Sequence, residues 1–201
     1  MLVRMTGATF YFSELMPSDT RAVARGLRRR DPDLLDGLIQ QYQYRLYRYL
    51  FYLTGSQQTA EDLFQETWIR VLERGHQYDG QSKFETWLFA IARHLVVDAR
   101  RRKSPQSLDA LTEADSGQSF EPEVGGPSAL DLVASLETGA RIQTSLGQLP
   151  AIYREVLLLR FQEDLRLEEI AAVLGTPLPT VKSRLYRGLE ALRQLFGEGT
   201  R

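Results

Sequence analysis

The residues best suited to binding a partner molecule are the cations that follow a broken helix near the carboxyl end of the chain. The stretch EEIAAVLGTPLPTVKSRLYRG begins as an apolar helix, which Gly175, Pro177 and Pro179 then interrupt. Because glycine permits a left-handed turn and proline cannot continue a helix, the pattern predicts a second helix that restarts near Thr180. Cationic and hydroxyl side chains on such a helix can bind base edges and phosphates in a DNA major groove. The candidates are Thr180, Lys182, Ser183, Arg184, Tyr186 and Arg187.

The spacing within this stretch is typical of a helix-turn-helix. Ala171 is a small residue where two helices can cross, Gly175 stands at the turn, and Val181 can hold the second helix down. A small core is predicted from Ile170, Val173, Leu174, Leu178 and Leu185. The competing interpretation is an amphipathic hairpin with an ordinary solvated basic face.

A second basic cluster ends the stretch FETWLFAIARHLVVDARRRK. Its cations are Arg93, Arg100, Arg101, Arg102 and Lys103. Cations near a helix carboxyl end are favoured by the helix dipole in any protein, so the cluster alone favours no function. Aromatic residues precede it beside Lys83, however, and bases of single-stranded nucleic acid stack on such rings. These rings are Tyr78, Phe84 and Trp87, and burial in the core is the competing interpretation for Phe84 and Trp87.

A third candidate is the polar face of the helix predicted from TAEDLFQETWIRVLERG. Asp62, Gln65 and Glu66 lie on one face there, where they could dock a basic partner. The competing explanation is that the acids complement the helix dipole and keep the surface soluble, and charge alone favours it. The core face of the same helix is predicted from Phe64, Trp68, Val71 and Leu72.

Helical signals dominate the elements that must position these residues. Asp31 is a candidate N-cap, Pro32 suits the first helical position, and Gly55 is a stop signal for the helix between them. Ser82 and Glu85 fit a capping box for the helix that carries the second basic cluster. Strand signals are absent, so we expect an all-α protein.

Charge divides the chain into two mildly basic parts and an acidic connector. Residues 1–103 hold 16 Lys/Arg and 12 Asp/Glu, residues 104–138 hold 7 acids and no Lys/Arg, and residues 139–201 hold 9 basic and 7 acidic residues. The connector is rich in Ser, Gly and Pro, which is typical of a flexible linker. We therefore predict an N-terminal tail (1–18), a helical domain (19–103), a flexible acidic linker (104–138) and a helix-turn-helix domain (139–201).

Other function classes find little support in the sequence. The 201 residues include no cysteine and only two histidines, His76 and His94, so we expect no metal site and no cofactor. No run of about 20 apolar residues is present, so we expect no membrane insertion. The absence of cysteine favours a reducing environment, so we expect a cytoplasmic protein. No cluster of nucleophile, base and orienting group indicates an enzyme.

Three stretches together resemble one protein family. AEDLFQETWIRVLE, FETWLFAIARHLVVDARRRK and the stretch from Leu149 to Phe196 look like the signatures of bacterial sigma factors, and the two-block layout resembles the extracytoplasmic-function (ECF) type. The resemblance implies that the protein directs promoter-specific transcription initiation by RNA polymerase core, whose clamp helices and flap it would contact. It also implies promoter DNA, duplex and single-stranded, and an anti-sigma factor as partners.

The resemblance assigns a role to each candidate surface. Asp62, Gln65 and Glu66 would contact the core polymerase, and the helix from Thr180 would read the minus-thirty-five element, with Arg184 on phosphate. The loop near Asp79–Lys83 would capture a base during strand opening. The full minus-ten set is Tyr78, Asp79, Lys83, Phe84, Trp87, Arg93, His94, Arg100 and Arg101.

Three positions depart from the family pattern. His94 stands where asparagine is common, Pro179 stands where glycine is common, and Arg166 precedes the first motif helix in place of a Ser/Thr cap. Two other functions remain open from the sequence: a stand-alone helix-turn-helix regulator, which binds duplex DNA tightly without polymerase, and a helical adaptor, whose binding would be insensitive to salt.

Overall fold

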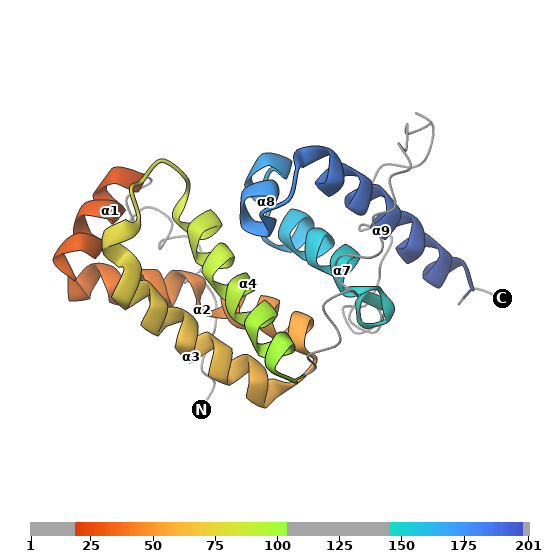
Figure 1. Ribbon diagram of the computed structural model, residues 1–201, viewed down its shortest axis with the longest axis horizontal. Coiled ribbons are helices and arrows are strands. Elements are labelled where there is room, and N and C mark those ends of the chain that lie inside the picture. Colours follow the sequence, from red (N-terminus) through yellow and green to blue (C-terminus); the bar gives the residue numbers. More distant parts are fainter. Residues whose placement is uncertain (1–18, 104–144, 199–201) are drawn as a thin grey trace, which may run out of the picture.

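The computed structural model describes residues 19–103 and 145–198, and every regular element in these two ranges is a helix (Figure 1). The predicted tail and the whole of the predicted linker lie outside the described residues. No helix in the described ranges combines the length and apolar character needed to cross a membrane.

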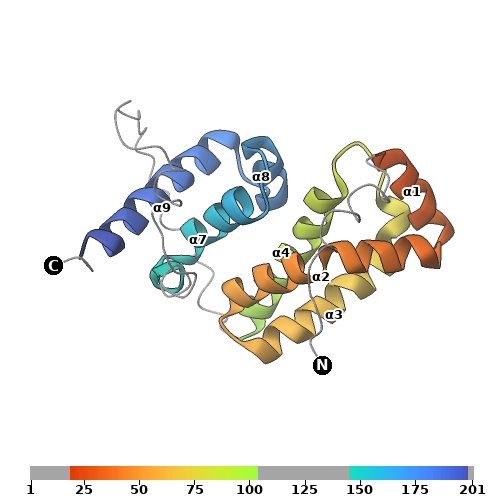
Figure 2. The ribbon, with the colours of Figure 1, turned by 180° about the vertical axis from the view of Figure 1, so that it is seen from behind.

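The first helical domain contains four α-helices. They are α1 (Thr20–Arg29), α2 (Pro32–Thr54), α3 (Gln57–Arg74) and α4 (Phe84–Lys103), with the short 3-10 helix η2 (Gly75–Gln77) after α3. The two caps predicted for α2 are confirmed: the Asp31 carboxylate accepts from the backbone N–H of Asp33, and Gly55 ends the helix in the left-handed conformation. In Figure 2, α2 runs across the domain with α3 beside it.

Two local predictions for this domain are wrong. α4 begins at Phe84 without the predicted capping box, and the carboxylate of Glu85 accepts instead from the phenol of Tyr42 at 2.9 Å. On α3, Leu72 was predicted in the core but is 46% exposed, whereas Leu63 is buried. Leu63 and Leu72 lie at opposite edges of the apolar stripe of α3. Only the position of the neighbouring helices decides which edge is buried.

The second helical domain carries the predicted helix-turn-helix. Its elements are α7 (Ala151–Leu157), a π-helical turn η4 (Leu158–Gln162), α8 (Leu167–Leu174) and α9 (Leu178–Glu198). Val181, Ile170 and Val173 are buried between α8 and α9, as the sequence predicted. α7 packs along α9, and Gly188 allows the close approach, because a Cβ there would lie 3.2 Å from Cβ of Tyr153.

Candidate nucleic-acid and protein interfaces

The turn between α8 and α9 is built as the sequence indicates, with one correction. Gly175 has φ +60° and donates its N–H to the carbonyl of Ala171, which ends α8. α9 begins at Leu178, two residues before the predicted restart at Thr180. Pro179 therefore lies in the first turn of α9, where the backbone needs no N–H donor. The departure from the family pattern at this position is compatible with an unbroken recognition helix.

The residues predicted to read DNA divide between two sides of α9. Lys182 and Tyr186 are exposed, and the Ser183 hydroxyl donates to the carbonyl of Thr180 at 3.1 Å. Arg187 is half-buried. Arg184 is also half-buried. Burial raises the pKa of the Glu155 carboxyl on α7, and the charge of Arg184 offsets only a small part of that rise. The structure thus presents Lys182 and Tyr186 outward and holds the side chain of Arg184 partly within the protein.

The missing Ser/Thr cap of α8 is replaced by a carboxylate. The backbone N–H of Arg166 donates to Oε2 of Glu169 at 2.7 Å, and the Arg166 guanidinium lies 3.2 Å from Oε1. Burial raises the pKa of Glu169, but the hydrogen bonds from Arg166 and Lys83 outweigh it, so the pKa is lowered overall. Glu169 therefore stays charged and caps α8.

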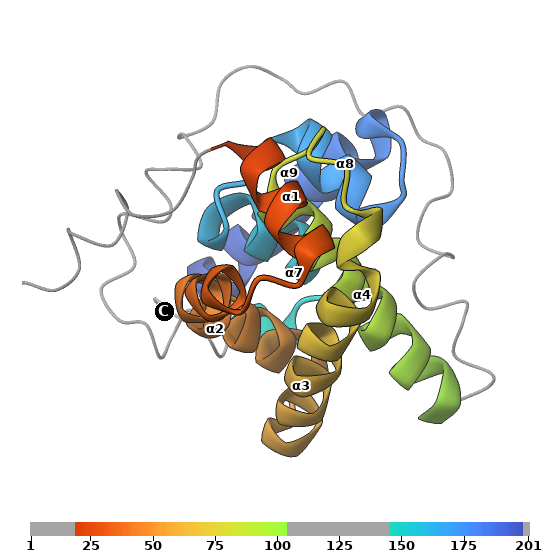
Figure 3. The same ribbon diagram turned by 90° about the vertical axis from the view of Figure 1, so that its left-hand side faces the viewer.

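The loop between η2 and α4 is fixed against α1. The Thr20 hydroxyl donates to the carbonyl of Gly80 at 2.5 Å, and the Tyr78 phenol donates to the carbonyl of Ser82 at 2.6 Å. The Asp79 carboxylate accepts from the backbone N–H of Gln81 at 2.9 Å, which tightens the turn. Figure 3 shows α1 beside this loop. The loop is thus a preorganised structure on the surface of the first domain.

The aromatic residues near the loop form one cluster, in which two of the three rings are buried. Tyr78 and Phe84 are 1% and 4% exposed, and their rings meet edge to face at 5.8 Å. Burial raises the pKa of Tyr78 to about 12. In this arrangement neither ring has an exposed face on which a base could stack, so both rings pack beneath the loop as part of the core. Trp87 is half-buried, 5.3 Å from the ring of Tyr78.

Substituting Gly80 tests how tightly the loop is held. Gly80 has φ +76°, and a Cβ there would lie 2.8 Å from the backbone oxygen of Thr20. We expect Gly80→Ala to lower the free energy of unfolding by at least about 2 kcal/mol, from backbone strain and the clash. Gly55→Ala is the matched control, because Gly55 has φ +66° but open space around it, and should cost about 1 kcal/mol. Urea unfolding measures both, and equal losses would contradict the docking of the loop on α1.

α3 presents a face that is acidic in the middle of the helix and apolar in its last turns. Asp62 and Gln65 are exposed, and Glu66 pairs with Arg70 at 2.8 Å. Ile69 and Leu72 lie on the same helical face and are each 46% exposed. Sequence reasoning found the acids but missed these two residues, since an exposed leucine and a buried one look alike in the sequence. Such a patch, apolar within a polar rim, is typical of a protein–protein interface.

Known proteins share both helical domains. The family model described as Sigma-70 region 2 matches residues 38–106, and that described as Sigma-70, region 4 matches residues 139–192. The chain is 34% identical over 171 residues to the ECF RNA polymerase sigma factor SigW of Bacillus subtilis (strain 168), covering 84% of this chain and 91% of that protein. The chain belongs to the ECF family of RNA polymerase sigma factors.

A second relative and two solved structures agree with this family. The ECF RNA polymerase sigma factor SigE of Mycolicibacterium smegmatis is 37% identical over 163 residues, covering 81% of this sigma factor and 62% of that protein. The fold resembles CnrH in its complex with the cytosolic domain of CnrY (TM-score 0.64, 20% identity, 90% of this chain, 99% of that chain). It also resembles the sigma factor RpoE in complex with the anti-sigma factor NepR from Bartonella quintana (TM-score 0.58, 23% identity, 80% and 96%).

Membership of this family bears on two functions considered from the sequence, an enzyme and a stand-alone regulator. Sigma factors are transcription initiation factors and not enzymes, as the sequence predicted. A stand-alone helix-turn-helix regulator is not favoured, because the relatives match the first domain as well as the second.

The two domains of this sigma factor contact each other through α4 and α8 and through α2 and α7. Two predicted minus-ten residues are used in this contact. Nζ of Lys83 lies 3.2 Å from Oε1 of Glu169, and Nε of Arg93 lies 3.3 Å from Oε1 of Glu155. In this closed arrangement, Lys83 and Arg93 are paired with carboxylates of the other domain.

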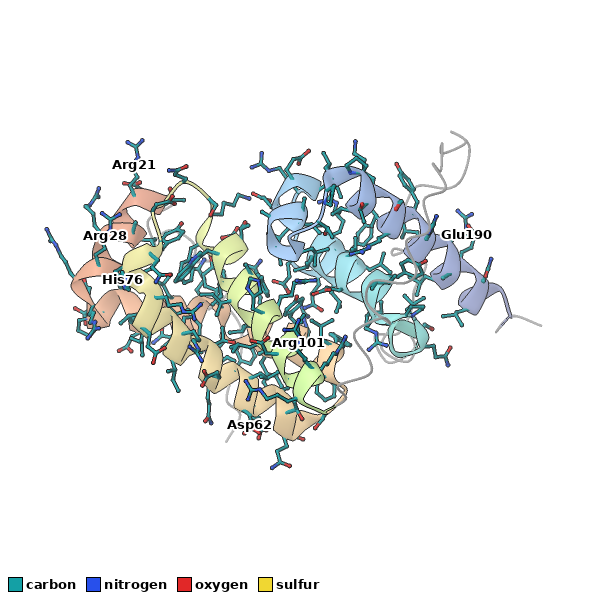
Figure 4. The ribbon with its side chains drawn as sticks, viewed as in Figure 1. Arg21, Arg28, Asp62, His76, Arg101 and Glu190 are labelled. Atoms are coloured by element: carbon teal, nitrogen blue, oxygen red, sulfur yellow. The ribbon has the colours of Figure 1, made fainter. Side chains whose placement is uncertain are left out.

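The remaining minus-ten candidates on α4 differ in accessibility. The Arg100 guanidinium donates to the carbonyl of Leu53 on α2, so it stabilises the first domain. His94 and Arg101 are exposed. Figure 4 shows Arg101 near the carboxyl end of α4.

Further buried polar contacts join the domains. The Tyr49 phenol donates to Oε1 of Glu155 at 3.0 Å, and Nε of Arg45 donates to Oε2 of Glu163 at 2.8 Å. Burial raises the pKa of the Glu155 carboxyl, and Arg93 and Tyr49 offset only part of that effect. The Glu163 side chain is 0% exposed and depends on Arg45 for its ion pair. The interface is therefore polar and sensitive to the loss of single partners.

Proposed function

We propose that this sigma factor binds core RNA polymerase through α3 and recognises a promoter at two points. The loop at residues 78–83 and the exposed part of α4 would hold the minus-ten element and help to open it, and α9 would read the minus-thirty-five element as duplex. The clamp helices and flap of the polymerase are the expected protein contacts. Because the proposed function requires polymerase and DNA, we expect the protein to act in the cytoplasm.

One observation carries this proposal: two different surfaces suited to nucleic acid lie on two different domains. The loop is preorganised by Thr20 and Tyr78, Trp87 in the first turn of α4 is accessible in part, and His94 further along α4 is exposed. α9 presents Lys182 and Tyr186 outward on a helix suited to a major groove. Each surface alone offers few contacts, and joining two weak sites in one chain gives a tighter and more selective reader.

The contacts between the domains indicate that they separate when the factor works. Lys83 and Arg93 can bind the promoter only if Glu169 and Glu155 release them. We infer that polymerase binding supplies the energy for this separation and that an anti-sigma factor is a further partner, which would oppose it.

Run-off transcription with core polymerase on a library of genomic promoter fragments tests the function. We expect transcripts only when both proteins are present, with start sites that share a minus-ten and a minus-thirty-five element. Failure of the purified protein to bind core polymerase would exclude the proposal. Tight, sequence-specific duplex binding without polymerase would favour the stand-alone regulator instead.

Lys182→Ala is expected to relax recognition at one part of the minus-thirty-five element. A cationic contact to a base edge is worth about 1–3 kcal/mol of discrimination, so holoenzyme should lose roughly 5- to 150-fold in preference at that position. Binding measured on promoters with each base substituted in turn would show the change. Gln194→Ala, exposed further along α9, is the control and should leave the preference intact.

A further inference from the structure

The exposed side of α1 is a row of arginines to which sequence reasoning assigned no role. Four of them lie within the helix and are exposed: Arg21, Arg25, Arg28 and Arg29. At 3.6 residues per turn they fall within an arc of about 100°. The buried residues of α1, which are Val23, Ala24 and Leu27, occupy the opposite side. We call these four side chains the α1 arginine face.

The folding of α1 does not explain this face. The helix dipole favours cations in the last turn, as for Arg28 and Arg29, but disfavours Arg21 in the first turn. Arg25 stands four residues after Arg21 and four before Arg29, and like charges at this spacing destabilise a helix by a few tenths of a kcal/mol. Among the described residues, the face has one ion pair, Arg25 to Asp19 at 3.8 Å, between two exposed side chains. The arginines are therefore left available to an anionic partner.

The α1 arginine face lies beside the loop proposed to hold the minus-ten element. Thr20, next to Arg21, bonds the carbonyl of Gly80, and a Cβ at Gly80 would lie 3.2 Å from Cα of Arg21. Leu27 similarly approaches Gly75 of η2. In Figure 4, Arg21 and Arg28 project outward from the body of the protein, and His76 of η2 is near them. A DNA strand that leaves the loop on the side of α1 would next lie along these arginine side chains.

We propose that the α1 arginine face binds the phosphates of the promoter strand that continues past the base held in the loop. Guanidinium groups bind phosphate oxygens in pairs and remain charged at every physiological pH. Phosphate contacts of this kind position a strand and carry no sequence information. The inference rests on the proposed function, because it extends the minus-ten surface by a track that is independent of sequence.

The composition of the face favours nucleic acid over two other anionic partners. None of the large exposed hydrophobic side chains of the described residues lies on α1. A docking site for an acidic protein would be expected to include such a side chain at its centre, and membrane binding would need apolar residues to insert. An uninterrupted row of arginines fits a regular row of phosphates.

The test compares Arg21→Gln/Arg28→Gln with the control Arg48→Gln/Arg193→Gln. The control removes the same charge from exposed positions on α2 and α9. Each full-length variant is assembled with core polymerase and titrated with a fluorescent forked probe, which carries a minus-ten element, a single-stranded extension past it and no minus-thirty-five element. The titration is repeated at several salt concentrations, and core affinity is measured separately.

We expect the arginine variant to bind the probe roughly 3- to 10-fold more weakly at 0.1 M salt, with unchanged affinity for core. The slope of log affinity against log salt should flatten by about 1.4, or 0.7 for each lost contact to a single strand. Shortening the extension should abolish the difference from wild type. The control should match wild type throughout.

Two results would overturn the inference and leave the proposed function standing. One is a wild-type affinity and salt slope in the arginine variant. The other is binding of wild type, but not of the arginine variant, to vesicles with about 30% anionic lipid while probe binding is unaffected, which would identify a membrane surface. If wild-type holoenzyme itself failed to bind the probe, the proposed function would fall with the inference.

Discussion

Replacing Ile69 and Leu72 together with glutamate is expected to lower the affinity of the sigma factor for core RNA polymerase by roughly 100- to 1,000-fold. Each side chain is 46% exposed in the free protein, between the acids of α3, and would be covered when this face docks. Truncating a central interface residue commonly costs about 2 kcal/mol, and an acid in its place adds the cost of burying a charge. Competition against labelled wild-type protein for core polymerase measures the loss.

Tyr186→Glu is the control for this prediction. Tyr186 is 45% exposed on α9, so the two substitutions place new acids at equally accessible positions of different domains. We expect Tyr186→Glu to reduce minus-thirty-five binding and to retain core affinity through α3. The melting temperature of both variants should stay close to that of wild type. A double variant that folds and still binds core like wild type would rule out α3 as the docking face.

Arg45→Ala is expected to separate the two domains. Removing Arg45 leaves the Glu163 carboxylate, 0% exposed, without its ion-pair partner. An uncompensated buried charge costs about 3–5 kcal/mol, and opening the interface relieves this cost by returning the carboxylate to water. The equilibrium constant for separation of the domains should therefore rise by more than about 100-fold. The stability of the interface itself sets the upper limit of this rise.

Energy transfer between two dyes would report this opening. The chain has no cysteine, so Asp36→Cys and Gln194→Cys introduce one exposed labelling site in each domain. We expect lower transfer in Arg45→Ala and tighter binding of a minus-ten single strand, because Lys83 and Arg93 are released. Arg45→Leu/Glu163→Leu should restore the transfer, since replacing both partners of a buried pair with apolar residues is often neutral. Unchanged transfer in Arg45→Ala would show that this ion pair does not hold the domains together.

Local signals explain which parts of the fold the sequence could predict. The caps of α2 at Asp31 and Gly55 and the turn at Gly175 depend on neighbouring residues, and all three were predicted correctly. Leu72 was placed wrongly because its burial depends on helices distant in sequence. The start of α9 was predicted two residues late, because proline stops a helix in its interior but is tolerated in its first turn.

The sequence predicted the types of residue in the candidate sites, but not which residues pair with each other. The cations on α4 and α9 were identified by their type, but nothing in the sequence indicated that Arg93 would pair with Glu155, 62 positions later. Tyr78 and Phe84 carry the same aromatic signal whether they stack on a base or fill a core. Nothing in the sequence indicated that the loop packs against α1, beside the arginines of that helix.

The division of α9 into two sides has a consequence for engineering. Lys182 and Tyr186 face outward, whereas Arg184 lies within reach of the charge of Glu155. Positions 182 and 186 can therefore be randomised in a selection for new promoter preferences while position 184 is held constant. Libraries restricted in this way would yield orthogonal initiation factors for synthetic gene circuits that keep the parent's interdomain contacts.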